Sequence, residues 1–459
     1  MKRCFSVVMF LFCAELSLAQ ITGQLFFDKG ASVCFVGNSI TNNGEFHHNL
    51  LLYHITRFPD QPVNFYNCGI SGDNTGGVLN RMEDDILTHQ PTHAVIMLGM
   101  NDVQRSLYGE KETMDTDTLK KREEAIHLYK ENLEKIITGF LSKNIRVILQ
   151  KPTIYDQTAI LAAGNNFGVN DALKKCAGFI GELAVKYELP TVDYWTIMEQ
   201  VNLKMQSKDP SATLTGPDRI HPASTGHLVM TYQFLKSEHA PKYISKISLG
   251  KNKEISAEKS ENCEIISFSK HKNGVSFVVK ENSLPFPTIE SQHEGLELIP
   301  FTDELNVELL KVDDLKKGQY HLDIDGILIG SFSDGQLNAG INLSEFRNTP
   351  QYLQALKVRD KLAELWEMEA ALRGIKFIEY NSYFKAFKDK ENMDALKAYL
   401  DNVFTQKYGS HANYYKIQLK RYMLNKPNEG KFEQASDLLR EEAYHLAQTR
   451  GHVFSIIYR

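Results

Sequence analysis

The sequence predicts a three-layer α/β/α sandwich around a parallel sheet, with a small antiparallel β module and a C-terminal helical region added to it. Between residue 30 and about residue 240, short apolar runs alternate with longer helical patterns. Such alternation is typical of parallel strands joined by right-handed crossovers. After residue 240 it stops, and hairpin signals followed by helical spacing of leucines take its place.

Five apolar runs are expected to form the parallel sheet, because continuous apolar runs bounded by turn residues are typical of buried strands. They lie at residues 32–36, 63–68, 94–98, 145–150 and 190–194. Helical patterns separate or follow them near residues 44–57, 75–88, 118–142, 171–187 and 224–238. Ligands of such sheets bind at the carboxyl ends of the strands, so we expect a site at that edge.

Two tight-turn signals mark the predicted β module. The pairs Asn273-Gly274 and Asp325-Gly326 favour hairpin turns, and each lies between alternating runs, at 265–279 and 320–329. From Leu353 onward the spacing is helical, with further helical segments near 391–406, 411–424 and 431–448. We therefore expect an α/β domain over residues 20–240, a β-rich module over 241–335 and a helical region over 336–459.

The first nineteen residues have the pattern of an export signal. Lys2 and Arg3 precede a mostly apolar run over 4–18, and small residues lie before Gln20, as at a cleavage site. A membrane anchor is less favoured, because the run is short and broken by Glu15. No cysteine follows at a position suited to lipid attachment, and no later stretch is apolar enough to span a bilayer. We expect a secreted or periplasmic protein without an integral membrane segment after cleavage.

Composition narrows the class of protein further. A hydrophobic content of 42% is ordinary for a globular chain, and a formal charge of −5 argues against nucleic-acid binding. The cysteines beyond the signal show no zinc pattern, and their spacing leaves disulfide pairing open; they are Cys34, Cys68, Cys176 and Cys263. The sequence does not indicate an oligomeric state.

Four short polar patches follow predicted strands or precede a predicted helix of the α/β domain. They are Gly37-Asn38-Ser39-Ile40-Thr41, the segment 67–74, Gly99-Met100-Asn101-Asp102 and the segment 216–222. Taken singly, each has an ordinary explanation as a turn, a surface loop or a helix cap. Their occurrence in order along one alternating domain favours a shared site.

The residue types in these patches suit acyl transfer by a serine. Ser39 follows a buried strand at a helix start, where a nucleophile can be exposed on a rigid support. His221 can act as its base, and Asp218 can orient the imidazole. The N–H groups of Ser39 and Gly72 and the carboxamide of Asn101 can receive the developing oxyanion.

These four patches resemble blocks I, II, III and V of the SGNH (GDSL-type) hydrolase family, over residues 30–240. The resemblance implies a flavodoxin-like sandwich and assigns the nucleophile to Ser39, the triad partners to Asp218 and His221, and oxyanion-hole roles to Gly72 and Asn101. It implies no metal and no organic cofactor. Two residues depart from the family pattern: Asn38 stands for the usual Asp and Thr41 for the usual Leu.

The expected function is therefore that of an exported serine esterase. Because the family includes lipases, thioesterases and carbohydrate deacetylases, the substrate class stays open. Expected export and the added C-terminal modules favour O-acetyl groups on carbohydrate, such as plant cell-wall polysaccharide or oligosaccharide. One alternative is a lipid esterase or lysophospholipase. Another is a non-catalytic glycan-binding protein that retains the hydrolase domain as a platform, although the intact Ser, Asp and His argue against it.

Other candidates are weaker. The pair His47-His48 could bind a metal, but only distant His54 follows it, so a solvated or capping role is favoured. The Gly-rich loop 164–170 could form a substrate wall or be a plain connection. The C-terminal aromatic residues, including Trp366, are expected to pack helices rather than bind sugar.

Overall fold

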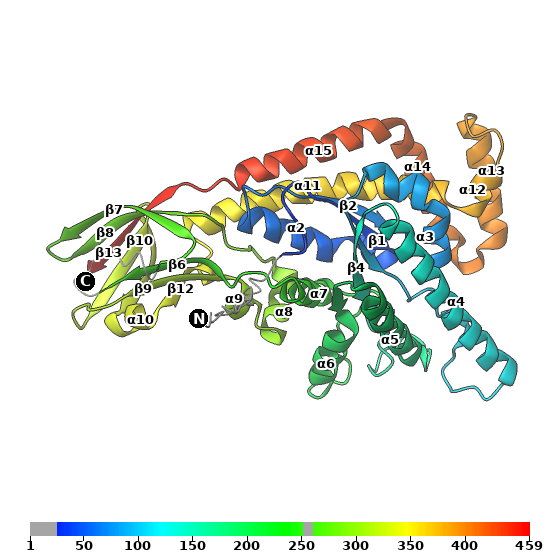
Figure 1. Ribbon diagram of the computed structural model, residues 1–459, viewed down its shortest axis with the longest axis horizontal. Helices are drawn as coiled ribbons and strands as arrows, with labels where there is room; N and C mark the ends of the chain where they lie inside the picture. Colours follow the sequence, from blue (N-terminus) through cyan, green and yellow to red (C-terminus); the bar gives the residue numbers. More distant parts are fainter. Residues whose placement is uncertain (1–24, 251–259) are drawn as a thin grey trace, which may run out of the picture.

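A five-stranded parallel sheet forms the centre of the first part of the chain. The computed structural model describes residues 25–250 and 260–459, so the expected export signal lies outside the described residues (Figure 1). The strand order is β2-β1-β3-β4-β5, and every neighbouring pair is parallel. The strands are β1 (Ser32–Gly37), β2 (Asn64–Gly69), β3 (His93–Met97), β4 (Arg146–Lys151) and β5 (Thr191–Asp193). The predicted sandwich is confirmed.

Helices cover both faces of this sheet. On one face α2 (Glu45–Arg57) packs against α7 (Ser224–Ser237), and α7 also contacts α6 (Tyr194–Gln206). On the other face α4 (Thr116–Leu141) packs between α3 (Thr75–Arg81) and α5 (Val169–Tyr187). The expected helix at 75–88 is α3 extended by a π turn and a 3-10 turn. Sequence patterns missed α6 and the short α1 (Ser39–Asn43), which Gly44 separates from α2.

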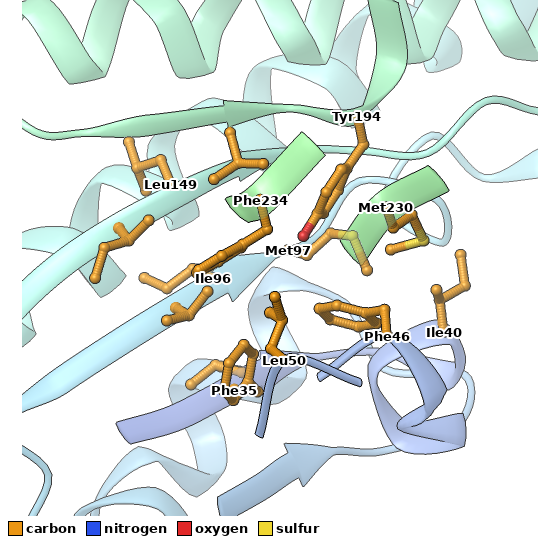
Figure 2. Packing of buried hydrophobic residues seen from close by; sticks show 14 of the residues in the cluster. Phe35, Ile40, Phe46, Leu50, Ile96, Met97, Leu149, Tyr194, Met230 and Phe234 are labelled. Atoms are coloured by element: carbon orange, nitrogen blue, oxygen red, sulfur yellow. The ribbon is translucent and has the colours of Figure 1, made fainter. Parts of the chain in front are cut away.

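Apolar side chains from the sheet and from α2 and α7 form one continuous core. Figure 2 shows strand residues facing the helices that cover one side of the sheet. Fully or almost fully buried members are Phe35, Ile96, Leu149, Phe46, Leu50, Tyr194, Met230 and Phe234. Burial on both faces explains why these strands are continuous apolar runs rather than alternating ones.

The β module contains two sheets with a shared apolar core. One sheet has the order β11-β10-β13-β8-β7 and is antiparallel; the other has the order β12-β9-β6. Both predicted hairpins form, β7–β8 and β10–β11. The strands are β6 (Tyr243–Leu249), β7 (Cys263–His271), β8 (Gly274–Glu281), β9 (Val307–Val312), β10 (Gln319–Ile324), β11 (Ile327–Ser333), β12 (Ile341–Asn342) and β13 (Gly451–Tyr458).

Two features of the module differ from the expectation. β6 and β9 pair in parallel, so the module is not wholly antiparallel. β13 lies within the segment assigned to the helical region, yet it inserts between β10 and β8. Its alternate side chains His452, Phe454 and Ile456 are buried, which is the period of a half-buried strand. The chain therefore returns to the β module after leaving the helices.

The segment between β8 and β9 packs on the α/β domain rather than on the β module. It holds the short helices α8 (His293–Leu298) and α9 (Phe301–Leu305). Leu284, Phe286 and Phe301 belong to the core of the α/β domain. The remaining short helix, α10 (Asp334–Ala339), follows β11.

The C-terminal region contains two long helices that lie along the α/β domain (Figure 1). They are α11 (Pro350–Glu379) and α15 (Glu429–Leu446), which pack against each other. α11 starts with Pro350 after the capping residue Thr349, a favourable helix start. The helices α12 (Ser382–Ala386), α13 (Met393–Lys407) and α14 (Ala412–Asn425) form a separate apolar cluster with the end of α11. α11 also contacts α2 and β2, so it borders the edge of the parallel sheet.

Two findings bear on the remaining expectations. Within residues 25–250 and 260–459, no helix has the length and apolar character that a membrane span requires. The four cysteines beyond the expected signal are free thiols, and three of them are buried.

Candidate active site

Ser39 is the first residue of α1, directly after β1. The carboxamide oxygen of Asn38 accepts a hydrogen bond of 3.1 Å from the Ile40 N–H and so caps α1. A side chain at Gly37 would place its Cβ 2.1 Å from Thr41 Oγ1 and 2.8 Å from the Met97 carbonyl oxygen. The turn therefore needs glycine before Asn38, and Asn38, one of the two departures from the family pattern, serves as the helix cap.

His221 lies between Ser39 and Asp218. Its Nε2 is 2.7 Å from Ser39 Oγ, and its Nδ1 is 2.5 Å from Asp218 Oδ2. The other carboxylate oxygen of Asp218 accepts the backbone N–H groups of Ile220 and His221, each at 3.0 Å. A hydroxyl, an imidazole and a carboxylate are thus connected in the order that serine activation requires.

The carboxylate of Asp218 is held in its charged form. Its side chain is 47% exposed and that of His221 is 46% exposed, so the site is open to solvent. Partial burial would raise the pKa of Asp218, but the hydrogen bonds from the His221 ring and from the two backbone N–H groups outweigh it and hold the pKa well below its usual range. The carboxylate accepts a hydrogen bond from Nδ1 and so selects the tautomer of His221 that leaves Nε2 as an acceptor for Ser39 Oγ.

Arg219 lies between Asp218 and His221 and anchors this loop to the chain that follows β4. The residue is buried and has a left-handed backbone, with φ of 67°. Its guanidinium donates hydrogen bonds to the carbonyl oxygens of Asp156, Ala159 and Ala163, at 3.0, 2.9 and 3.0 Å. The chain after β4 therefore wraps around Arg219 and positions the Asp218–His221 loop. Sequence analysis gave Arg219 no role, although it lies inside one of the four patches.

The loop 164–170 is tied to its surroundings by hydrogen bonds. Asn170 Oδ1 accepts from Trp195 Nε1 at 3.1 Å and from the Tyr155 N–H at 3.2 Å. Gly168, with φ of 91°, precedes the first turn of α5. These contacts favour the interpretation as a connecting loop that supports the Arg219 anchor.

Gly72 and Asn101 lie on the loops after β2 and β3, on either side of the strand that leads to Ser39. Gly72 has φ of 83°, in the region that favours glycine, and open space where a Cβ would be. Asn101 Nδ2 donates to the Asp73 carbonyl oxygen at 2.7 Å, which links the two loops. Arg105 donates to Asn101 Oδ1 at 2.9 Å. These partners orient the carboxamide, with its NH₂ group toward the Gly72 loop.

Asp102 fastens the Asn101 loop to the start of α3. Its carboxylate accepts the N–H and the hydroxyl of Thr75, at 2.8 and 2.6 Å, and the N–H of Gly99 at 3.0 Å. Burial raises the pKa of Asp102, and these hydrogen bonds oppose that effect. The residue was part of a predicted patch, but its structural role was not predicted.

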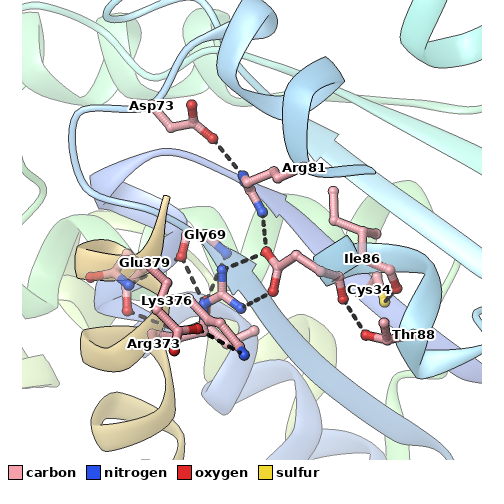
Figure 3. A network of polar contacts seen from close by, with 12 residues as sticks. Cys34, Gly69, Asp73, Arg81, Ile86, Thr88, Arg373, Lys376 and Glu379 are labelled. Atoms are coloured by element: carbon pink, nitrogen blue, oxygen red, sulfur yellow. Dashed lines mark hydrogen bonds and ion pairs between the residues drawn. The ribbon is translucent and has the colours of Figure 1, made fainter. Parts of the chain in front are cut away.

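A buried ionic network connects the Gly72 loop to the C-terminal helix α11 (Figure 3). Arg81 pairs with Asp73 at 2.8 Å and with Asp85 at 2.6 Å. Arg373 of α11 pairs with both oxygens of Asp85, at 2.8 and 2.9 Å, and donates to the Gly69 carbonyl oxygen at 3.0 Å. Burial would raise the pKa of Asp85, but Arg373 and Arg81 hold it well below its usual range.

Comparison with known proteins places the site within a family. Residues 35–229 match the GDSL-like Lipase/Acylhydrolase family. We call this part of the chain the GDSL-like domain. An acetylxylan esterase of Geobacillus stearothermophilus is 22% identical over 180 residues, which are 39% of this chain and 74% of that protein.

Solved structures extend the similarity beyond the GDSL-like domain. A gut microbial diltiazem-metabolizing enzyme is 29% identical with a TM-score of 0.85, over 95% of this chain and 99% of that one. A crystal structure of an acetylxylan esterase from Geobacillus stearothermophilus gives 20% identity and a TM-score of 0.38, over 46% of this chain and 95% of that one. The β module and the helical region thus recur together with the GDSL-like domain in the first of these proteins.

Of the two roles expected for His47 and His48, solvated or capping, the solvated one is wrong, because both residues are buried in the GDSL-like domain. His47 Nε2 is 3.1 Å from the Thr41 carbonyl oxygen, and His48 Nε2 is 3.0 Å from a Glu369 oxygen. Trp366 stacks on His48 with ring centroids 4.6 Å apart. Among the described residues, no group of three or more potential metal ligands is arranged around a common point.

Proposed function

We propose that the protein is a serine ester hydrolase with Ser39 as nucleophile, His221 as general base and acid, and Asp218 as the group that orients His221. The observation that carries this proposal is the hydrogen-bonded series from Ser39 Oγ through the imidazole to Asp218. Membership of residues 35–229 in the acylhydrolase family supports the reaction class.

Each proton in the proposed reaction has a donor and an acceptor among these residues and water. His221 Nε2 takes the hydroxyl proton while Ser39 Oγ bonds to the ester carbonyl carbon. The oxyanion receives hydrogen bonds from the N–H groups of Ser39 and Gly72 and from Asn101 Nδ2. His221 then gives its proton to the departing alkoxide, and the carbon–oxygen bond to the alcohol breaks. Water repeats these steps on the acyl-enzyme, releasing the acid and restoring Ser39.

We further propose that the ester is an O-acetyl group on carbohydrate. The support is the 22% identity with a protein named acetylxylan esterase. The mechanism uses protein groups and water, with no cofactor.

We also propose that the protein is exported, with cleavage before Gln20. N-terminal sequencing of the protein from the periplasm or medium is expected to find Gln20 first, and an intact Met1 there would contradict the proposal.

The first experiment measures hydrolysis of an aryl acetate. Ser39→Ala is expected to lower kcat by at least about a thousandfold, because the nucleophile is lost. Ser237→Ala is a matched control, since its hydroxyl only bonds to the Gln233 carbonyl in α7. Full activity of Ser39→Ala, or equal inertness of wild type and Ser39→Ala, would contradict the mechanism. The second result would favour a glycan-binding protein.

A panel of substrates separates the ester classes. Acetylated oligosaccharides, acetylated polysaccharides and lysophospholipids are incubated with wild type, and released acetate and fatty acid are measured. Release of acetate from the carbohydrates alone is expected. Release of fatty acid without acetate would identify a lipid esterase and overturn the carbohydrate proposal.

A further inference from the structure

A groove of about 500 Å³ lies beside the loop that carries Gly72. The loop Ile70–Asp73 and the end of α3 form one wall. The end of α11 together with α12 and α14 forms the other, and its ring-bearing residues are Phe377, Tyr380 and Tyr415. We call this cavity the aromatic groove. It joins the C-terminal region to the proposed oxyanion-binding loop.

The strand order places the aromatic groove on one side of Ser39. Gly72 follows β2, the edge strand that α11 contacts. The Arg219 anchor binds the chain after β4, on the other side of β1. A substrate with its ester at Ser39 can therefore extend over Gly72 into the groove. An acetyl group alone is too small to occupy this volume.

Both walls of the groove are held in place by contacts that do not depend on a ligand. The network from Asp73 through Arg81 and Asp85 to Arg373 fastens α11 to the Gly72 loop (Figure 3). Phe377 packs on Tyr415 with ring centroids 5.4 Å apart. A wall that is ordered before the substrate arrives lowers the entropic cost of binding.

The lining has the chemistry of a sugar subsite. Its aromatic rings offer apolar surface on which the C–H face of a pyranose can pack, although one face of Tyr380 has Lys385 Nζ 4.7 Å from the ring centroid. The amide of Asn80 and the hydroxyl of Ser382 can bond to sugar hydroxyls. Pockets that combine aromatic walls with a few polar groups are typical of small-molecule sites. Resting on the proposed function of Ser39, we propose that the aromatic groove binds a sugar ring of the substrate, away from the acetylated position.

The test compares a long and a short ester. Tyr380→Ala is expected to raise KM for acetylated xylo-oligosaccharides about tenfold, because a stacking surface is lost. It should leave kcat/KM for methyl acetate unchanged, since methyl acetate cannot reach the groove. Tyr399→Ala is the matched control: Tyr399 stacks on Phe387 in the same helical region, outside the groove.

A second variant keeps the test decisive if Tyr380→Ala does not fold. Ser382 is exposed at the start of α12, so Ser382→Trp fills the groove without disturbing a core. It should raise KM for the oligosaccharide and spare methyl acetate. An unchanged oligosaccharide KM in folded Tyr380→Ala or in Ser382→Trp, or equal losses on both esters, would overturn the proposal.

A binding measurement separates this proposal from the proposed function. Xylo-oligosaccharides without acetyl groups, which carry no ester to hydrolyse, are titrated into Ser39→Ala and into Ser39→Ala/Tyr380→Ala by calorimetry. Weaker binding by about tenfold in the double variant supports the groove even if Ser39→Ala is found to retain activity. Equal binding of the two proteins refutes the groove and leaves the role of Ser39 unaffected.

Discussion

Asp218 uses both carboxylate oxygens, one for the His221 ring and one for two backbone N–H groups. In Asp218→Asn, the oxygen can still accept the backbone N–H groups, but the amide would then face Nδ1 with its own N–H. His221 must then carry its proton on Nε2, where it cannot accept the proton of Ser39.

Asp218→Asn is therefore expected to lower kcat for an aryl acetate by about 10³ to 10⁴-fold with little change in Tm. Steady-state kinetics and thermal unfolding measure the two quantities. Asp209→Asn is the control, because Asp209 accepts hydrogen bonds from Ser211 in an exposed turn outside the loop that carries Asp218 and His221. Activity within a few-fold of wild type would show that Asp218 does not orient the base.

At the scale of elements, α2 and α11 explain where the predictions from sequence were incomplete. α2 lies between the sheet, α7 and α11, so almost all of its residues are buried, including His47 and His48. Because polar residues occur on every side of α2, its sequence predicts a helix that is half-exposed to solvent. The remaining face is covered by α11 and by the segment between β8 and β9, which both come much later in the chain.

The ion pair between α11 and the GDSL-like domain is expected to matter for stability. Arg373→Met leaves the buried Asp85 with Arg81 alone and the Gly69 carbonyl with Asn42 as its donor, so the free energy of unfolding should fall by about 3 kcal/mol. Urea denaturation measures this. The double variant Asp85→Asn/Arg373→Met should recover part of the loss, because a buried carboxylate that has lost one of its two arginine partners is removed, while Arg81 keeps Asp73.

Lys361→Met on the same helix is the control. Lys361 pairs with Glu364 and Glu442 near the surface, where an ion pair contributes at most about 1 kcal/mol. An equal loss of unfolding free energy in Lys361→Met and Arg373→Met would show that the buried network stabilises the fold no more than a surface ion pair does.

At the scale of the whole molecule, the parts of the chain meet around two buried acidic residues. Glu281 of β8 accepts hydrogen bonds from Ser245 of β6 and from Gln351 of α11, the latter at 2.6 Å. Glu308 of β9 is its buried neighbour. Burial raises the pKa of both, and that of Glu308 is well above its usual range because the charge of Glu281 adds to burial.

This pair makes stability depend on pH. The unfolded carboxyls lose their protons near pH 4.5, whereas the folded pair retains a proton to higher pH, so the free energy of unfolding falls as pH rises above that value. In Glu308→Gln the side chain at this position is neutral at every pH, so the folded pair no longer has to retain a proton. The free energy of unfolding of the variant should exceed that of wild type by about 1 to 3 kcal/mol at pH 8, and by less at pH 5. Urea denaturation at the two pH values measures it, with exposed Glu290→Gln as control; a gain that does not depend on pH would contradict this account.

The sequence alone determined the parallel sheet, both hairpins and the residues of the candidate site, because these depend on local patterns. Buried strands are continuous apolar runs, Asn-Gly and Asp-Gly pairs set tight turns, and Ser39 and the Asp218–His221 loop lie at strand ends or helix starts. The tertiary structure decided what depends on contacts between distant segments. β13 enters a sheet whose other strands end more than a hundred residues earlier, and Arg373 pairs with Asp85 across 288 positions. Burial of His47 and His48, the Arg219 anchor and the aromatic groove arise in the same way, since no local pattern records which distant segment will cover a given face.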